Sequence, residues 1–199
     1  IEQSLPDEVT FTLGPSGDGA FSISIASDDD RLDTGGAFFD DAFCVDVALN
    51  FIFDEPLVAD VYLATDTEAD GTPDQVEGLP DGIVPDEQNL DLVNWILNQD
   101  FRSVDNGDGT GTNYTGNEIQ RAIWTLTNES DGYNNRSANA QEIVDLARAE
   151  GEGFIAGEGD KVAVILNPVF ADDLPAADQP YQPFVVAYDY DTLKEDCIC

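Results

Sequence analysis

Residues 66–77, DTEADGTPDQVE, have the spacing of a twelve-residue calcium-binding loop. Carboxylates stand at its first, third, fifth, ninth and twelfth positions, which are Asp66, Glu68, Asp70, Asp74 and Glu77. Gly71 stands at the sixth position, where such loops turn sharply around clustered oxygen ligands. The flanking segments carry an alternating pattern on one side and Gly/Pro residues on the other, so they differ from the helices of an EF-hand. The spacing predicts a calcium loop between non-helical elements, with a solvated turn as the alternative.

The chain contains three cysteines, Cys44, Cys197 and Cys199, and no histidine. The lack of histidine excludes Ser-His-Asp and Cys-His catalysis as well as histidine zinc sites, and we expect no enzymatic activity. Cys197 and Cys199 are disulfide candidates. One of them could pair with Cys44, the two could pair with each other, or one could join a neighbouring chain. The sequence leaves these pairings open.

Cys44 belongs to a segment, 42–53, whose apolar residues alternate and predict a strand. Its large apolar side chains share one face and are expected in the core: Phe43, Val45, Val47, Leu49, Phe51 and Phe53. Cys44 lies on the opposite face with small or polar residues, among them Asp46. Because such a face forms no core by itself, we expect another element to cover it.

Residues 116–130, GNEIQRAIWTLTNES, predict a helix with an apolar stripe. Thr115 and Glu118 have the spacing of a capping box at its start. Gln120 and Trp124 lie one turn apart on the flank of the stripe, so both are expected to face the same place.

The remaining elements place these two segments in a fold. We expect further strands over 9–13, 20–26, 58–64, 161–167 and 183–190, and further helices over 85–101 and 139–151. Strands followed by helices and again by strands indicate an α+β class: an antiparallel β-sandwich or barrel with an inserted three-helix subdomain. We expect a single domain over 1–199, with a β body of 1–64 and 161–190. The helical insertion, about 85–151, is available to cover the Cys44 face.

Three short motifs resemble a known family. FCVD at 43–46, a helix of the VNWILN type at 93–98 and QRAIW at 120–124 are similar, in this order, to thioester domains of bacterial surface adhesins and related secreted proteins. The resemblance covers about residues 38–150. The short gap between Cys44 and Gln120, the acidity and the terminal Cys-x-Cys depart from the family's pattern.

The resemblance implies a thioester between the Cys44 sulfur and the Gln120 side-chain carbonyl, formed with loss of ammonia. Phe43, Asp46 and Trp124 would then form the environment of the bond and help to exclude water. An amine or hydroxyl of a surface protein or glycan could attack the thioester, which gives a single-use crosslink. The alternative is that Cys44 is a small buried filler or a disulfide partner, and Gln120 a surface residue beside a core tryptophan.

The chain carries 42 acidic and 7 basic residues in 199, a net charge of −35. Such a surface repels nucleic acid and anionic lipid, so we expect neither nucleic-acid binding nor membrane insertion. Self-repulsion is relieved by salt or bound cations, which favours an extracellular or cell-surface location in a saline, calcium-containing medium. Three sequons, at Asn113, Asn128 and Asn135, predict glycans.

Together these features predict an extracellular cell-surface adhesion module that attaches covalently through Cys44 and Gln120. The alternative is a structural subunit of an extracellular filament or surface layer, stabilised by calcium, glycosylated and joined to copies of itself. A calcium-dependent binding domain without a crosslink is a third possibility.

Overall fold

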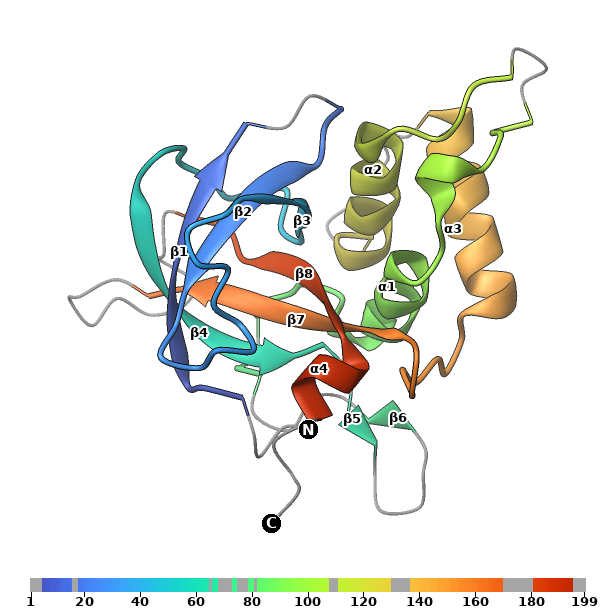
Figure 1. The fold of residues 1–199 in the computed structure, drawn as a ribbon. Coiled ribbons are helices and arrows are strands. Elements are labelled where there is room, and N and C mark those ends of the chain that lie inside the picture. Colours follow the sequence, from blue (N-terminus) through green and yellow to red (C-terminus); the bar gives the residue numbers. More distant parts are fainter. Residues whose placement is uncertain are drawn as a thin grey trace.

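The computed structural model describes residues 5–15, 18–64, 66–67, 73–74, 79–80, 82–107, 111–129, 137–169 and 181–194. Six antiparallel strands close into a barrel in the order β1-β2-β3-β8-β7-β4 (Figure 1). Their bounds are β1 Glu8–Gly14, β2 Phe21–Ala26, β3 Phe39–Cys44, β4 Pro56–Leu63, β7 Lys161–Pro168 and β8 Phe184–Asp189. The short strands β5 (Asp66–Thr67) and β6 (Pro73–Asp74) pair separately. The predicted α+β class and antiparallel pairing are therefore confirmed, and the sheet is a closed barrel.

The first hairpin follows from its alternating sequence. β1 pairs with β2, with Phe11 opposite Ile25 and Leu13 opposite Ile23, and all four side chains are buried. The other edge of β1 pairs with β4, which closes the barrel, while β3 pairs with β8 from the far end of the chain. Because every second residue of a strand points inward, these strands fill the barrel interior with large apolar side chains.

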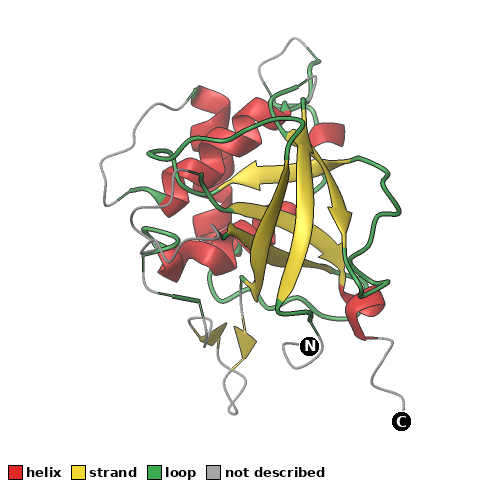
Figure 2. Cartoon of the chain, turned by 90° about the vertical axis from the view of Figure 1, so that its left-hand side faces the viewer, coloured by secondary structure: helices red, strands yellow, loops and turns green. Residues whose placement is uncertain are grey.

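Three longer helices pack together beside the barrel (Figures 1 and 2). They are α1 (Leu90–Leu97), α2 (Gly116–Thr127) and α3 (Ala138–Glu150). Two 3₁₀ turns, Glu87–Asn89 and Phe101–Ser103, flank α1, and a short helix α4 (Tyr190–Lys194) follows β8. The helix predicted over 85–101 is thus shorter than expected. The Asn98 side chain donates to the carbonyls of Asn94 and Lys161 at 2.8 Å each, which ends α1 against β7.

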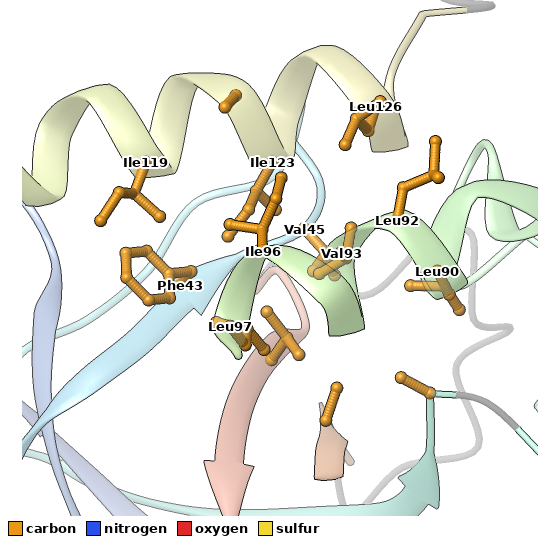
Figure 3. Close-up of a cluster of buried hydrophobic side chains, with 14 of the residues drawn as sticks. Phe43, Val45, Leu90, Leu92, Val93, Ile96, Leu97, Ile119, Ile123 and Leu126 are labelled. Carbon is orange, nitrogen blue, oxygen red and sulfur yellow. The ribbon is translucent and has the colours of Figure 1, made fainter. Parts of the chain in front are cut away.

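Among the described residues the helices share one core with the outer face of the barrel, because their apolar faces pack on it. Phe43 and Val45 lie beside Ile119, Ile123 and Ile96 of the helices in one buried cluster (Figure 3). That cluster also includes residues of β7 and β8, so these strands are buried on both faces. The barrel and the helices consequently share one continuous apolar contact.

The predicted capping box of α2 is present. The Thr115 hydroxyl accepts from the Glu118 N–H at 3.3 Å, and the Glu118 carboxylate accepts from the Thr115 N–H at 2.8 Å. Helix α3 begins one residue before the predicted start at Asn139, because the Ser137 hydroxyl caps it and accepts from the Ala140 N–H at 3.2 Å. The Asn139 amide donates to Glu118.

The strand predicted over 42–53 is wrong beyond Cys44, where β3 ends. Asp46 accepts a hydrogen bond from the Ala48 N–H at 2.7 Å, which makes a local turn in place of a ladder. Asp54 has a φ of 60° and turns the chain again before β4. Val47, Phe51 and Phe53, expected in the core, are exposed at 37%, 40% and 37%.

Candidate functional site

Cys44 and Gln120 meet at the junction of the barrel and the helices. The Cys44 N–H donates to Gln120 Oε1 at 2.8 Å, and Gln120 Nε2 donates to the Cys44 carbonyl, also at 2.8 Å. The two residues are 76 positions apart and nearly inaccessible, with 0% and 3% exposure. One side-chain amide therefore satisfies both main-chain groups of the cysteine.

The ends of the neighbouring strands explain why the Cys44 main chain is available to a side chain. The Val45 N–H donates to the Pro183 carbonyl, so the preceding N–H and C=O of Cys44 point away from β8. The last β2–β3 pair is Phe21 with Ala42, and Cys44 extends beyond it. Gln120 thus occupies a ladder position that no strand fills.

The face on which Cys44 lies differs from the prediction. Cys44 belongs to the buried cluster inside the barrel, together with Ala42 and Phe184, while Phe43 and Val45 face the helices. The helices therefore cover the large apolar face of β3 and not the cysteine face. The reason is barrel closure: the small side chains of Ala42 and Cys44 leave room for large residues from the opposite strands.

Asn128 is a second amide that fixes α2 to this segment. Its Nδ2 donates to the Val45 carbonyl at 2.9 Å, and its Oδ1 accepts from the Val47 N–H at 3.1 Å. The side chain is fully buried. The predicted glycan on Asn128 is therefore wrong for the folded chain, because the nitrogen that would carry it lies in the interior. Sequence reasoning missed this structural role, since the residue was interpreted only as part of a sequon.

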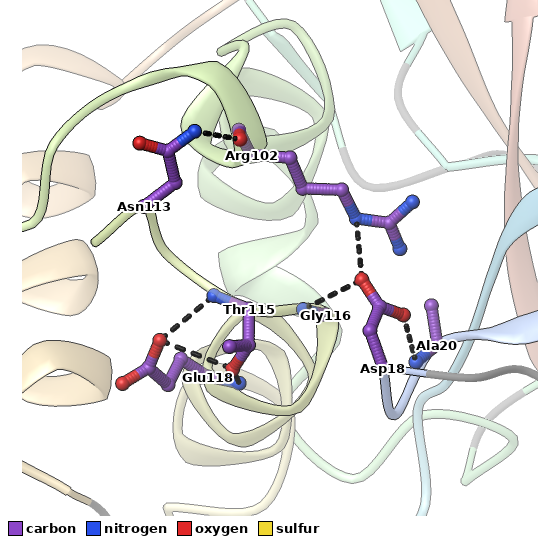
Figure 4. Close-up of polar contacts among 7 residues, drawn as sticks. All are labelled: Asp18, Ala20, Arg102, Asn113, Thr115, Gly116 and Glu118. Atoms are coloured by element: carbon purple, nitrogen blue, oxygen red, sulfur yellow. Dashed lines mark hydrogen bonds and ion pairs between the residues drawn. The ribbon is translucent and has the colours of Figure 1, made fainter.

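Phe43 forms a link between the site and a charged pair. The Arg102 guanidinium carbon lies 6.0 Å from the centre of the Phe43 ring. Arg102 Nε also lies 3.3 Å from a carboxylate oxygen of Asp18, which accepts a hydrogen bond from the Gly116 N–H at the start of α2 (Figure 4). The β1–β2 loop, Arg102 and α2 are thereby joined over the outer side of β3.

Trp124 and Asp46 complete the predicted surroundings. Trp124 is partly buried and packs against the cluster inside the barrel to which Cys44 belongs. Asp46 is 8% exposed and holds the turn that directly follows Cys44. A pocket of about 510 Å³ reaches Phe43 and Ile119, the residues that precede Cys44 and Gln120.

Among the described residues Cys44 has no disulfide partner, and its surroundings favour the protonated thiol. Burial raises the pKa of the Cys44 thiol well above its ordinary value, and the nearby charge of Asp46 raises it further. The arrangement therefore brings a thiol whose neutral form is favoured, a side-chain amide and a hydrogen bond to the amide oxygen into one buried region.

The other predicted site residues are divided between described and undescribed segments. Asp66 and Asp74 pair through their backbones in β5 and β6, while Glu68, Asp70 and Glu77 lie outside the described residues. Within the described ranges, no group of three acidic, cysteine or histidine side chains is placed to hold a metal ion. Asn135, Cys197 and Cys199 also lie outside these ranges, and Asn113 is exposed. In the same part of the chain, no helix is both long and apolar enough to cross a membrane.

The fold and site define a small antiparallel barrel with packed helices and a buried Cys–Gln contact at their junction. Among solved structures, the N-terminal thioester domain of fibronectin-binding protein SfbI from Streptococcus pyogenes is similar, with 12% identity and a TM-score of 0.46 over 92% of this chain and 93% of that one. The N-terminal thioester domain of a surface protein from Clostridium perfringens matches with 13% identity and a TM-score of 0.45 over 90% and 97%. Both are thioester domains, the family that the sequence motifs resemble. No family model and no curated protein matches the chain.

Proposed function

We propose that the protein is a cell-surface adhesion module that attaches covalently to a partner through a thioester between Cys44 and Gln120. The observation that carries this proposal is the paired hydrogen bonding of the Gln120 amide with the main chain of Cys44, at 2.8 Å in both directions. A glutamine held this way has little freedom, and enforced proximity is what an unreactive amide needs.

One contact favours the chemical step. The hydrogen bond from the Cys44 N–H withdraws charge from Gln120 Oε1 and would stabilise the oxyanion formed when sulfur attacks Cδ. The neutral thiol carries the proton that the departing nitrogen requires. A sulfur–carbon bond forms, the carbon–nitrogen bond breaks, and the nitrogen leaves with the thiol proton as ammonia.

Attachment would reverse the roles of these atoms. An amine of the partner attacks the thioester carbonyl, the new carbon–nitrogen bond replaces the carbon–sulfur bond, and the sulfur regains a proton. A hydroxyl would give an ester in the same way. Until then the buried position of both residues, with Phe43 and Trp124 near, keeps water from the acyl group.

The mass of the intact chain tests the proposal. Purified without amine buffers, the wild type should be lighter than its sequence by one ammonia, and methylamine should then add to it. Cys44→Ala and Gln120→Ala should both abolish the loss. Gln141→Ala, on the exposed face of α3, should retain it. Variants lacking Cys197 and Cys199 separate this bond from a disulfide to the tail.

A wild-type mass equal to that of the unmodified sequence, with Cys44 alkylated after unfolding, would rule out the thioester. The alternative function, a subunit of a filament or surface layer, remains a prediction. It is tested on a non-reducing gel, where disulfides between chains would support it. In either function the exposed Asn113 remains a proposed glycan acceptor.

A further inference from the structure

Three aromatic rings lie in contact at the end of the barrel near Cys44. Phe51 lies 4.9 Å from Phe21 and 5.2 Å from Phe53 between ring centres, and Phe21 lies 5.8 Å from Phe53. We name Phe21, Phe51 and Phe53 the aromatic patch. Phe51 and Phe53 are each more than a third exposed. Single exposed apolar side chains are common on protein surfaces, whereas exposed apolar side chains in contact with one another often mark a binding site.

The patch is held in place by the main chain around it. The Asp54 N–H donates to the Leu13 carbonyl at 2.9 Å, and the Gln182 N–H donates to the Asn50 carbonyl at 2.8 Å. These bonds fix the segment on both sides of Phe51 and Phe53. A rigid aromatic surface loses little conformational entropy when it binds, which suits a docking surface.

The patch is also continuous with the candidate thioester site. Phe21 lies 5.8 Å from Phe184 between ring centres, and Phe184 is the β8 residue paired with Cys44. The segment 45–55, which carries Phe51 and Phe53, begins directly after Cys44. A partner bound on the patch would therefore be held within a few residues of the reactive bond.

The negative charge around the aromatic patch indicates which kind of partner can bind to it. Asp54 and Glu55 are exposed beside Phe53, and the whole chain carries a net charge of −35. A second copy of the chain or an anionic membrane would be repelled. A polypeptide that presents an apolar side chain next to a lysine or arginine would match both the rings and the carboxylates.

We infer that the aromatic patch is a noncovalent docking surface that selects a basic, apolar segment of a polypeptide partner before covalent attachment. The inference rests on the proposed thioester for its biological use, but the docking itself does not require the bond. It assigns the choice of partner to residues outside the reacting pair.

Three amine probes test the inference: methylamine and the blocked tripeptide amides Leu-Phe-Lys and Ser-Ser-Lys. The adduct of each is followed by mass. The wild type should react with Leu-Phe-Lys at least about fivefold faster than with Ser-Ser-Lys, as expected for partial burial of two rings. Phe51→Ser/Phe53→Ser should remove this preference and leave the methylamine rate unchanged. Val104→Ser, which changes an exposed apolar residue elsewhere, should behave as the wild type.

Equal rates for the two peptides with the wild type would overturn the inference, as would a double variant that slows all three amines alike. Self-association of the wild type that the double variant abolishes, without any peptide preference, would assign the patch to a second copy. If the wild type loses no ammonia and forms no adduct, the proposed function fails. Binding of the same peptides, followed by nuclear magnetic resonance of the phenylalanine rings, then decides the docking: shifts confined to Phe21, Phe51 and Phe53 support it and their absence overturns it.

Discussion

Gln120 of α2 and Asn128 at its C-cap are two amide side chains that bind consecutive stretches of main chain at the end of β3 and just beyond it. Between them they hold the N–H of Cys44 and Val47 and the carbonyls of Cys44 and Val45. An amide that donates and accepts with the same stretch of backbone replaces an absent strand. The position of Cys44 is therefore determined by α2 as much as by the sheet.

Replacement of Asn128 by alanine should loosen this arrangement. Asn128→Ala removes the partners of the Val45 carbonyl and Val47 N–H and should lower the free energy of unfolding by roughly 2 kcal/mol. It should also slow the loss of ammonia from freshly folded chain. Urea unfolding and timed mass measurements check both effects. Asn113→Ala, at an exposed position, is the control, and equal losses in the two variants would contradict the prediction.

Asp29 and Arg31 give a pH-dependent contribution to stability. The pKa of Asp29 is lowered, and the largest cause is the hydrogen bond that its carboxylate accepts from the Arg31 side chain. Arg31 also donates to the Leu193 carbonyl of α4 at 3.0 Å. Because the folded pKa is the lower one, the contribution is complete above the unfolded value near 3.9 and is lost as the pH falls through the folded value.

The comparison of wild type with Arg31→Met isolates this contribution from the many other carboxylates. The wild type should be more stable by about 1 kcal/mol at neutral pH. The difference should stay constant down to about pH 4 and shrink at lower pH as Asp29 is protonated. Thermal unfolding from pH 3 to pH 7 measures it. A difference that grows on acidification would show that the ion pair has another role.

The chemical types and the helical spacing were sufficient to predict where Gln120 and Trp124 lie, because one turn of a capped helix fixes them. Alternation alone did not predict that the Cys44 side chain points into the barrel, because it does not indicate which face of a strand a closed barrel encloses. Asn128 was missed for a related reason: its partners lie on a segment that is distant in sequence and has no ladder of its own.

At the scale of elements, the β1–β2 loop contacts the start of α2. Gly19 has a φ of 102°, and a Cβ there would lie 2.6 Å from the Asn117 Cβ of α2. The same loop accepts a hydrogen bond from the Asn117 N–H at the Asp18 carbonyl, 2.8 Å away. The chain before β2 is thus held against the start of α2.

Gly19→Ala should therefore separate α2 from the barrel. It should cost more free energy of unfolding than Gly35→Ala by about 2 kcal/mol, because Gly35 has a φ of 60° but no atom within 4 Å of the added carbon. The control retains a positive φ and omits the clash. Chemical denaturation with equal slopes for the two variants measures the difference. A matching loss in Gly35→Ala would assign the whole effect to backbone strain.

Periodicity was a good guide to most elements and failed where side chains compete with the ladder. Turn residues bound short apolar segments at 9–13, 20–26, 58–64, 161–167 and 183–190, which made these strands predictable; the first two also alternate. The segment after Cys44 alternates equally well, yet Asp46 and Asp54 turn it out of the sheet. Closure of the barrel depends on pairings between distant strands, which a local pattern does not contain.

At the scale of the whole molecule, the charge of −35 opposes folding through self-repulsion. Raising NaCl from 0.1 M to 1 M shortens the Debye length from about 10 Å to about 3 Å. The melting temperature should therefore rise with salt over this range. A melting temperature that is constant or falls over the same range would show that repulsion is already compensated within the folded chain.

Calcium should act beyond this general screening if residues 66–77 form the proposed loop. At constant ionic strength, chelator should lower the melting temperature and calcium should restore it, whereas sodium should not. Asp66→Asn/Asp74→Asn should lose the response, and Asp28→Asn/Asp30→Asn, another pair of neutralised acids, should keep it. An unchanged response in the first variant would place the ion elsewhere.

Closure of the barrel also limits how copies of this chain could join. Polymers that grow by strand addition need a sheet edge with free N–H and C=O groups, and each of the six barrel strands is paired on both sides. Cys44 lies beyond the last β2–β3 pair, and its main-chain N–H and C=O, which β2 does not reach, are hydrogen-bonded by the Gln120 amide. The Gln120 amide thus also protects against edge-to-edge aggregation. Its loss would leave the N–H and C=O of Cys44 unpaired, and a second molecule could begin to pair with them.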